Sequence, residues 1–187
     1  KNISFIIIFQ FLLVVFAFAE TNTNEDFNKW LKNYKEDALN KGISQRTLDI
    51  TFKNVQFLEK VIGYDRKQPE FYEDTVTYVK KRATDSRAKT ATKLFKKNKN
   101  LFINVEKKFK VEKEILLALW GIETNFGKHV GKMDIVSCIA TLSFDKRRRS
   151  FFSSQLFTLL ELVEQNLIDP NTLYGSWAGA YGNFQFM

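Results

Sequence analysis

Proline is almost absent from this chain, and its absence limits the possible folds more than any other feature. The 187 residues contain only Pro69 and Pro170, together with 8 glycines. Proline and glycine end helices and form the tight turns that join short strands. Their scarcity favours long helices over a turn-dense sandwich or barrel. Because 44% of the residues are hydrophobic, the chain can also build a core. We therefore expect an all-α fold.

An apolar run occupies residues 3–19, directly after Lys1, and it closes with an A-x-A pattern at Ala17 and Ala19. A cationic start, an apolar stretch and an A-x-A end are typical of a secretory signal peptide. The run also approaches the roughly 18 residues that span a bilayer, so an uncleaved membrane anchor is the alternative. We predict a signal peptide over 1–19. No cysteine near the junction could carry a lipid, so a lipoprotein is not expected.

After the signal peptide, apolar residues recur at helical spacing with no repeat or linker between them. We therefore expect one domain over 20–187, with N-terminal helices in 24–110 and a catalytic core portion in 111–187. Asp65 to Phe71, which contains Pro69, is expected to be a connector. The helices that we expect begin or extend as follows: from the capping box at Thr23 to Gly42, from the cap Ser44 through Val55, from Tyr72 to Arg82, from Ser86 to Phe109, from Glu112 to Glu123, and from Phe151 to Asp169.

The chain has a single cysteine, Cys138, and a single histidine, His129. This excludes a disulfide framework, a Cys/His zinc site and a two-histidine metal centre, and we expect neither a metal nor a cofactor. Cys138 lies between apolar neighbours and is expected to be buried and inert. His129 is expected on a loop or at the surface. Carboxylates remain as the chemical groups on which catalysis could depend.

The formal net charge is +8. On an exported chain, this charge indicates anionic envelope polymers or membrane surfaces before nucleic acid, although simple solubility explains it equally well. Many lysines lie between Leu94 and Phe109, but they alternate with apolar residues at helical spacing. We interpret them as a solvated helix face rather than a polyanion site, and we expect no nucleic-acid partner.

The segment from Glu112 to Glu123 carries the most informative pattern. Its apolar residues at i, i+1, i+4 and i+7 predict a firmly buried helix face formed by Ile115, Leu116, Leu119 and Ile122. Glu123 follows at the C-terminal end, where desolvation and the helix dipole both favour a protonated carboxyl that could donate its proton. The alternative is an exposed glutamate at a helix end with no catalytic role.

Two later segments could contact a ligand. Three adjacent arginines at 147–149 could bind carboxylates in fork geometry, or they could form a solvated cluster. The segment 175–182 combines small residues with Trp177 and Tyr181. Small residues beside flat aromatic rings suit a sugar subsite, while the alternative is a tight crossing of two helices.

Taken in order, these motifs resemble the lytic murein transglycosylase B family over about residues 30–187. The similarity rests on Asp-Arg-Lys-Gln-Pro-Glu-Phe at 65–71, Gly-Ile-Glu-Thr-Asn-Phe-Gly at 121–127, Ala-Thr-Leu-Ser-Phe at 140–144, the arginines before Phe151, Gly-Ser-Trp-Ala-Gly-Ala at 175–180 and Gln-Phe-Met at 185–187. The resemblance implies an all-α, lysozyme-like catalytic domain. Because the family's cleft is completed by a segment after Gln-Phe-Met, we expect the domain to be incomplete at its C-terminal end.

The resemblance also implies an activity. The family cleaves the β-1,4 bond between N-acetylmuramic acid and N-acetylglucosamine in peptidoglycan without water, leaving 1,6-anhydromuramic ends. Glu123 is then the single acid and base, which fits a chain with no second motif carboxylate nearby. The substrate-binding positions implied by the family are Ser176, Gln185, Phe186, Arg147, Arg148 and Arg149.

Two rival readings stay open. The first is a lysozyme-type hydrolase that uses Glu123 as acid and a water activated by Asp134 or Asp145. The second is a murein-binding fragment without catalysis. In each case the expected partners are peptidoglycan glycan strands and the expected location is the Gram-negative periplasm. We expect a monomer whose only contact with a membrane would be an uncleaved N-terminal segment.

Overall fold

The computed structural model describes residues 24–67 and 73–187. The predicted signal peptide and the part of the predicted connector around Pro69 lie outside these residues. Within them nearly all of the regular secondary structure is helical, with two strands of two residues each, as the all-α prediction requires. Among the described residues, no helix combines the length and apolarity needed to cross a bilayer.

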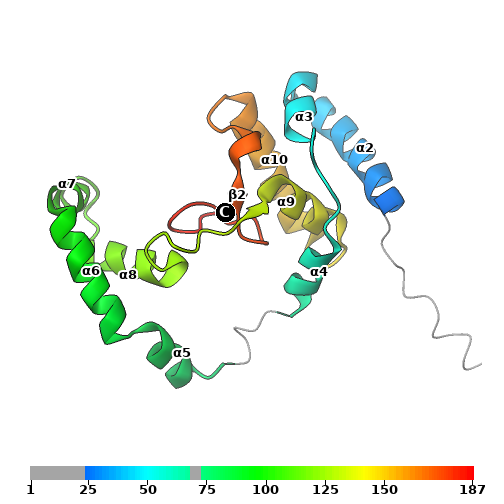
Figure 1. Ribbon diagram of the computed structural model, residues 1–187. Coiled ribbons are helices and arrows are strands. Elements are labelled where there is room, and N and C mark those ends of the chain that lie inside the picture. The colour runs from blue at the N-terminus through cyan, green and yellow to red at the C-terminus, as the bar shows by residue number, and fades with distance from the viewer. Residues whose placement is uncertain (1–23, 68–72) are drawn as a thin grey trace, which may run out of the picture.

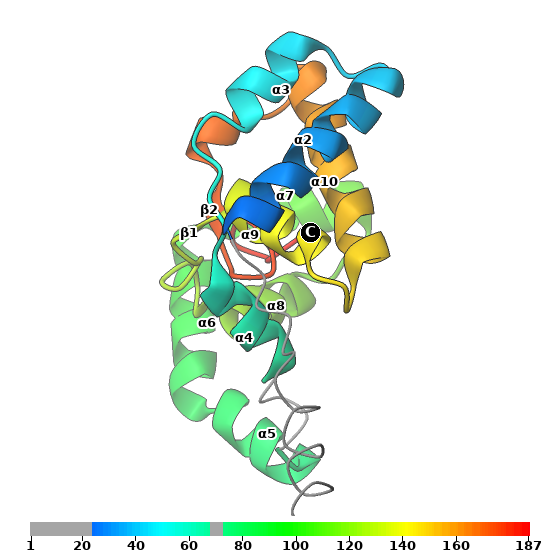
Figure 2. The same cartoon turned by 90° about the vertical axis from the view of Figure 1, so that its right-hand side faces the viewer.

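The elements follow one another as helices joined by turns and by longer loops, such as those between α3 and α4 and after α8 (Figures 1 and 2). Their bounds are α2 (Asn24–Asn40), α3 (Gln45–Thr51), α4 (Glu59–Arg66), α5 (Thr75–Arg82), α6 (Asp85–Lys97), α7 (Lys99–Phe109), α8 (Lys113–Thr124), β1 (Met133–Asp134), α9 (Ile135–Phe144), α10 (Arg149–Glu164), the 3-10 helix η2 (Pro170–Thr172) and β2 (Tyr174–Gly175).

Helix α9 forms the centre of the hydrophobic core. All ten of its residues are buried, and it packs against α10, α4 and α2. The apolar residues of this core come from α2, α3, α4, α9 and α10 and from the short segments beside them, and none comes from residues 75–124. The core is therefore built from two stretches of sequence that lie on either side of α5–α8.

Buried hydroxyl groups on α9 hold the segment between α3 and α4 in place. Ser137 Oγ accepts a hydrogen bond from the backbone N–H of Gln56 at 3.0 Å, and Thr141 Oγ1 accepts one from Leu58 N–H at 3.0 Å. Asp134 caps the helix by accepting from Ser137 N–H at 2.7 Å. Because a buried N–H without a partner is costly, these bonds fix the path of the chain into α4.

Helices α5–α8 form a second group, which Figure 1 shows on the other side of the C-terminal segment from α2, α3 and α10. Helix α8 packs against α6 and α7, and α6 also packs against α7. Few side chains are fully enclosed here: Phe102 and Leu117 are the buried large apolar residues of this group. The group is therefore held by a much smaller apolar centre than the α9 core.

The structure corrects several predicted boundaries. The helix expected from Ser86 to Phe109 is two helices, because Asn98 ends α6 with its side-chain Nδ2 donating to Leu94 O at 3.1 Å. The helix expected to reach Asp169 ends at Glu164. Helix α4 covers residues 59–66 and so includes the start of the expected connector. Helix α9 was not predicted.

The predicted buried face of α8 is wrong. The exposed fractions of Ile115, Leu119 and Ile122 are 49%, 44% and 45%, while Leu117 and Gly121 are buried. The reason is that α8 is packed against α6 and α7 and contributes nothing to the α9 core. Three large aliphatic side chains at helical spacing are thus open along the helix that carries Glu123.

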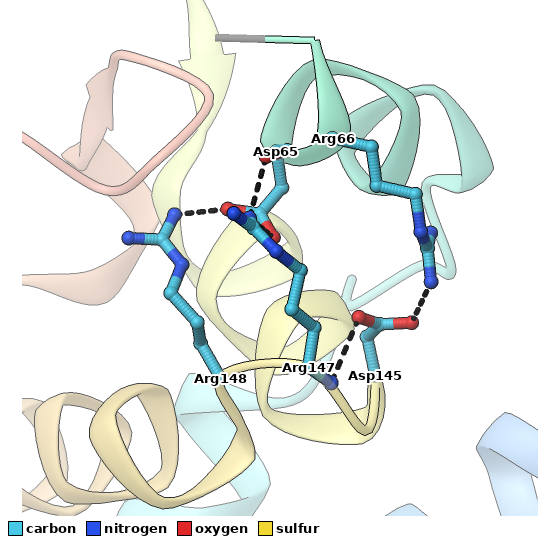
Figure 3. Close-up of polar contacts among 5 residues, drawn as sticks. All are labelled: Asp65, Arg66, Asp145, Arg147 and Arg148. Atoms are coloured by element: carbon cyan, nitrogen blue, oxygen red, sulfur yellow. Dashed lines mark hydrogen bonds and ion pairs between the residues drawn. The ribbon is translucent and has the colours of Figure 1, made fainter.

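Asp65 joins α4 to the turn between α9 and α10 (Figure 3). Its carboxylate is 1% exposed and forms ion pairs with Arg147, at 2.5 Å, and with Arg148. A second ion pair joins the same two segments in the opposite sense: Arg66 of α4 pairs with Asp145 of the turn at 2.9 Å. Removing a buried carboxylate that has two guanidinium partners costs far more stability than removing one partner of an exposed ion pair.

Replacing Asp65 with alanine should therefore lower the free energy of unfolding by about 2 kcal/mol, because it removes a buried carboxylate to which two partly exposed arginines, Arg147 and Arg148, are bound. Lys81→Ala is the comparison: its side chain is 64% exposed and its partner Glu73 keeps the ion pair with Arg82, so its loss should cost less than about 1 kcal/mol. Urea denaturation followed by circular dichroism measures both. Equal losses in the two variants would contradict the ranking.

Cys138 is fully buried on α9, as the sequence predicts. Burial raises the pKa of its thiol to about 12, with a smaller contribution from the charge of Asp134. Since the thiolate is the reactive form, we expect no alkylation of the folded protein by iodoacetamide at about pH 8.5, the ordinary thiol pKa. The same reagent should label Cys138 rapidly in guanidinium chloride. Mass spectrometry reads both, and labelling of the folded chain at the unfolded rate would refute the expectation.

Candidate active site

Glu123 lies in the last turn of α8, and its side chain is exposed, so the predicted desolvation of this carboxyl is wrong for the described chain. The chain then reverses through three consecutive residues with left-handed backbone: Asn125 (φ 48), Phe126 (φ 61) and Gly127 (φ 81). The backbone N–H of Phe126 donates to Trp120 O at 3.0 Å, which closes the helix end. The glutamate is therefore presented at a tightly fixed turn rather than on a continuous helix surface.

The turn depends on Gly121, which lies two residues before Glu123. The Phe126 ring folds back onto this glycine, and a Cβ there would lie 2.8 Å from the ring. The Phe126 ring also meets Trp120 edge to face, with 5.8 Å between centroids. This contact explains why the sequence 121–127 needs a small residue on the helix and an aromatic residue after it.

Ser176 begins a second tight turn, close to the N-terminal end of α9. Its Oγ accepts from Ala180 N–H at 3.0 Å, and its own N–H donates to Ala180 O at 2.9 Å. Gly179, with φ 92, lies so close to Ile139 that a Cβ would come within 2.6 Å of that side chain. The hydroxyl of Ser176 is thus held by the backbone and still has its own hydrogen available for donation.

Asn183 connects the C-terminal segment to the helix that carries Glu123. Its side-chain Oδ1 accepts from Trp120 Nε1 at 2.9 Å, and its backbone oxygen accepts from Thr124 Oγ1 at 2.9 Å. Thr124 is 1% exposed and also accepts from Gly127 N–H at 3.0 Å. Residues on both sides of Glu123 along α8 are therefore tied to the same residue of the C-terminal segment.

The two strands make a second connection between these segments. Met133 of β1 pairs with Gly175 of β2 in antiparallel register. Just before β1, Gly131 has φ 86, and a Cβ on it would lie 2.1 Å from the carbonyl of Gly175. Only glycine permits this approach. The loop after Glu123 is consequently pressed against the start of the Ser176 turn.

Gln185 and Phe186 differ in how far they are free to contact a ligand. The Gln185 amide Nε2 donates to Val130 O at 3.2 Å and to Gly182 O at 2.9 Å, so its N–H groups hold the two loops together. Phe186 pairs with Tyr181 through the backbone, and the residue is 74% exposed. The ring is therefore the freer of the two groups.

The three arginines of 147–149 lie at the junction of α4 and α10. Arg147 and Arg148 bind Asp65, and Arg149 donates to Phe144 O at 2.5 Å. Tyr64, which precedes Asp65, connects this junction to the Ser176 turn. Its ring contacts the ring of Trp177, with 6.3 Å between the centroids. The structure thus places Glu123, Ser176 and Gln185 on directly bonded segments, and the arginines one contact further away.

The sequence motifs predicted no role for Thr124, which lies inside the motif 121–127, or for Asn183, which lies between the motifs 175–180 and 185–187. Their importance follows from the hydrogen bond between them, which joins residues 59 positions apart, and from the bond of Trp120 to Asn183, 63 positions apart. No local pattern reveals either bond. His129 lies on the exposed loop after α8, as predicted. Among residues 24–67 and 73–187, no group of three His, Cys, Asp or Glu side chains could hold a metal ion.

Comparisons with known proteins identify the family. Residues 26–187 match the transglycosylase SLT domain family. A stretch of 78 residues, 41% of this chain, is 44% identical to membrane-bound lytic murein transglycosylase B of Escherichia coli strain K12, and it covers 22% of that protein.

Solved structures are similar over most of the chain. SltB3 from Pseudomonas aeruginosa in complex with NAG-NAM-pentapeptide matches 86% of this chain and 43% of its own, with a TM-score of 0.80 and 30% identity. The Escherichia coli lytic transglycosylase Slt35 in complex with bulgecin A matches 90% of this chain and 53% of its own, with a TM-score of 0.71 and 26% identity. The chain thus spans about half the length of these solved relatives. It has their all-α, lysozyme-like fold and belongs to the transglycosylase SLT domain family.

Proposed function

We propose that this chain acts on the glycan strands of peptidoglycan. In this proposal it cleaves the β-1,4 bond between N-acetylmuramic acid and N-acetylglucosamine without water and leaves a 1,6-anhydromuramic end, with Glu123 as the only acid and base. The observation that carries the proposal is the position of this carboxyl group. It is exposed at the end of α8, and its neighbours Trp120 and Thr124 are both bonded to Asn183 of the C-terminal segment.

The proposed reaction needs one group that first gives a proton and then takes one. The Glu123 carboxyl protonates the glycosidic oxygen, and the bond from that oxygen to C1 of the muramoyl residue breaks. The 6-hydroxyl of the same sugar then attacks C1, and Glu123 removes the hydroxyl proton. Atoms and charge balance without a water molecule or a second carboxylate.

Ser176 and Phe186 are suited to hold the sugar. The fixed Ser176 hydroxyl can donate its hydrogen to the acetamide carbonyl of an N-acetyl group, which orients that group toward C1. The exposed Phe186 ring offers a flat apolar surface to a sugar face. Gln185 supports the site by holding the loops together, and in this proposal Arg147, Arg148 and Arg149 face carboxylates of the substrate's peptide.

The structural relatives support the substrate class. SltB3, which is 30% identical to this chain, has been solved with NAG-NAM-pentapeptide and with NAG-anhNAM-pentapeptide. The first ligand is a sugar of the proposed substrate class, and the second contains the anhydro sugar of the proposed product. Such a substrate lies outside the cytoplasmic membrane, so the proposal also includes export to the periplasm.

The environment of two other carboxylates argues against the lysozyme-type alternative. Asp134 accepts from Ser137 N–H at 2.7 Å as the cap of α9. Asp145 is 3% exposed, pairs with Arg66 and accepts from Arg147 N–H at 3.2 Å. A carboxylate that activates water must be free to receive a proton, and both of these groups are engaged in holding the fold.

Digestion of purified sacculi tests the proposal. We expect wild-type chain to release 1,6-anhydromuropeptides and Glu123→Gln to release at least about a thousandfold less, because the amide can neither give nor take the proton. Mass spectrometry of the soluble products measures both. Products with reducing ends would favour the lysozyme-type reaction, and binding without products from either form would favour the murein-binding fragment.

Thr124→Val tests whether the bonds to Asn183 position Glu123. Valine has nearly the same shape as threonine but leaves Asn183 O and Gly127 N–H without their partner. We expect a loss of about 1 to 2 kcal/mol in unfolding free energy and a fall of about tenfold in anhydromuropeptide release. The comparison is Ser44→Ala, which removes a helix cap far from this site and should lower stability with little effect on turnover. Equal turnover in the two variants at a temperature where both are folded would argue against a positioning role.

A further inference from the structure

The positive charge of this chain is concentrated in one region. Residues 75–112, which cover α5, α6 and α7, contain twelve lysines and arginines against three acids. Their net charge is +9, whereas the whole chain carries +8. The rest of the molecule, including the α9 core and the Ser176 turn, is therefore close to neutral, and the charge is a property of this helical group.

Four lysines of α6 form a stripe along one side of the helix. Lys89, Lys93, Lys96 and Lys97 recur at helical spacing, and all four are exposed. None of them forms an ion pair with another residue in the described part of the chain. We call these four residues the lysine stripe.

The lysine stripe lies opposite the packed face of α6. Phe95 contacts Phe102 of α7, with 6.1 Å between ring centroids, and the exposed lysines point away from that contact. Successive members at i and i+4 lie about 6 Å apart along the helix axis, so like charges repel along the stripe. Elsewhere in the same group, Lys81, Arg82 and Lys113 all have acidic partners. The stripe is thus a linear array of cations left uncompensated within the described chain.

We propose that the lysine stripe binds carboxylates of the peptide stems of peptidoglycan, on strands beside the one in the candidate active site. This inference rests on the proposed function, because it takes its partner from the same polymer. The stems supply the matching chemistry: every free peptide end is a carboxylate, and stems repeat along a strand as the lysines repeat along α6. Since the stripe faces away from the contacts of α6, it can meet a neighbouring strand while the site is occupied.

The composition of the stripe favours this partner over a lipid surface. A helix that lies in a membrane interface needs large apolar residues such as Trp, Phe or Leu beside its cations. The other exposed residues of α6 are Asp85, Ser86, Ala88 and Thr92, which are small or polar. An array of cations without an apolar edge binds a hydrated anionic polymer through charge alone, and such binding weakens as salt rises.

The test measures binding of the full chain to purified sacculi in the Glu123→Gln background, so that no strand is cut. We expect Lys89→Gln, Lys93→Gln and Lys97→Gln together to weaken binding by about tenfold or more at low salt. The difference should vanish near 1 M salt, where the Debye length is about 3 Å. Replacing the same three residues with arginine keeps the charge and should keep the binding, which separates charge from folding.

A matched control removes three charges elsewhere. Lys29, Lys32 and Lys53 are also exposed, and changing them to glutamine lowers the net charge equally. We expect that variant to bind as the parent does; equal weakening would show that net charge alone matters and would overturn the proposal. Glycan strands freed of their peptides by an amidase should bind both forms alike, and persistence of the stripe's effect on them would also overturn it.

Two further outcomes are informative. Stripe-dependent binding to phosphatidylglycerol vesicles without stripe-dependent binding to sacculi would replace the polymer with a membrane as the partner. Failure of the proposed function is read separately, from product release by chain with Glu123 intact. If the protein cuts sacculi but binds them independently of the lysine stripe, this inference alone is wrong. If binding depends on the lysine stripe but no cutting is seen, the catalytic proposal alone is wrong.

Discussion

The burial of α9 is the constraint on which the rest of this structure depends. Each side of that helix needs a partner, and α2, α4 and α10 supply them. The hydroxyls that α9 buries, on Ser137 and Thr141, are satisfied by backbone N–H groups of the segment before α4. The core therefore sets the position of α4 and, through Asp65, that of the turn before α10. The start of α9 also holds β1, whose partner strand β2 leads into the Ser176 turn.

The candidate site lies where this rigid part meets a weakly enclosed one. Ser176 is anchored on α9, whereas Glu123 belongs to α8, whose helix contacts are mainly with α6 and α7. What aligns them is a small set of polar contacts at Asn183 and Gln185 together with the close approach of Gly131 to Gly175. Such contacts are directional, so they fix a geometry with little apolar burial.

Particular residues show why the sequence predicted some elements and missed others. The sequence predicted helix α2 because Phe27, Leu31 and Ala38 face the core while the opposite face meets water. Such a helix shows apolar residues at a helical period in its sequence. Helix α9 has no such period because all of its faces are buried, so its pattern was indistinguishable from an apolar run. On α8 the period was real but the partner was not in the described chain, and Ile115, Leu119 and Ile122 are exposed. The motifs in the sequence predicted Glu123, Ser176 and Gln185 as site residues. The hydrogen bonds that join their segments link residues far apart in sequence, so only the three-dimensional structure shows them.

The division of the core into two stretches of sequence has a consequence for how a nascent chain acquires its structure. Helices α2, α3 and α4 are synthesised first, but their apolar faces have no partner until α9 and α10 follow, after the whole α5–α8 group has been made. The packing of α9 against α10 is local in sequence and can form early, while closing the core around the intervening segment carries the larger entropic cost. The apolar faces of α2, α3 and α4 therefore stay uncovered until α9 and α10 have been made, and during that interval they are surfaces that a holding chaperone would have to shield.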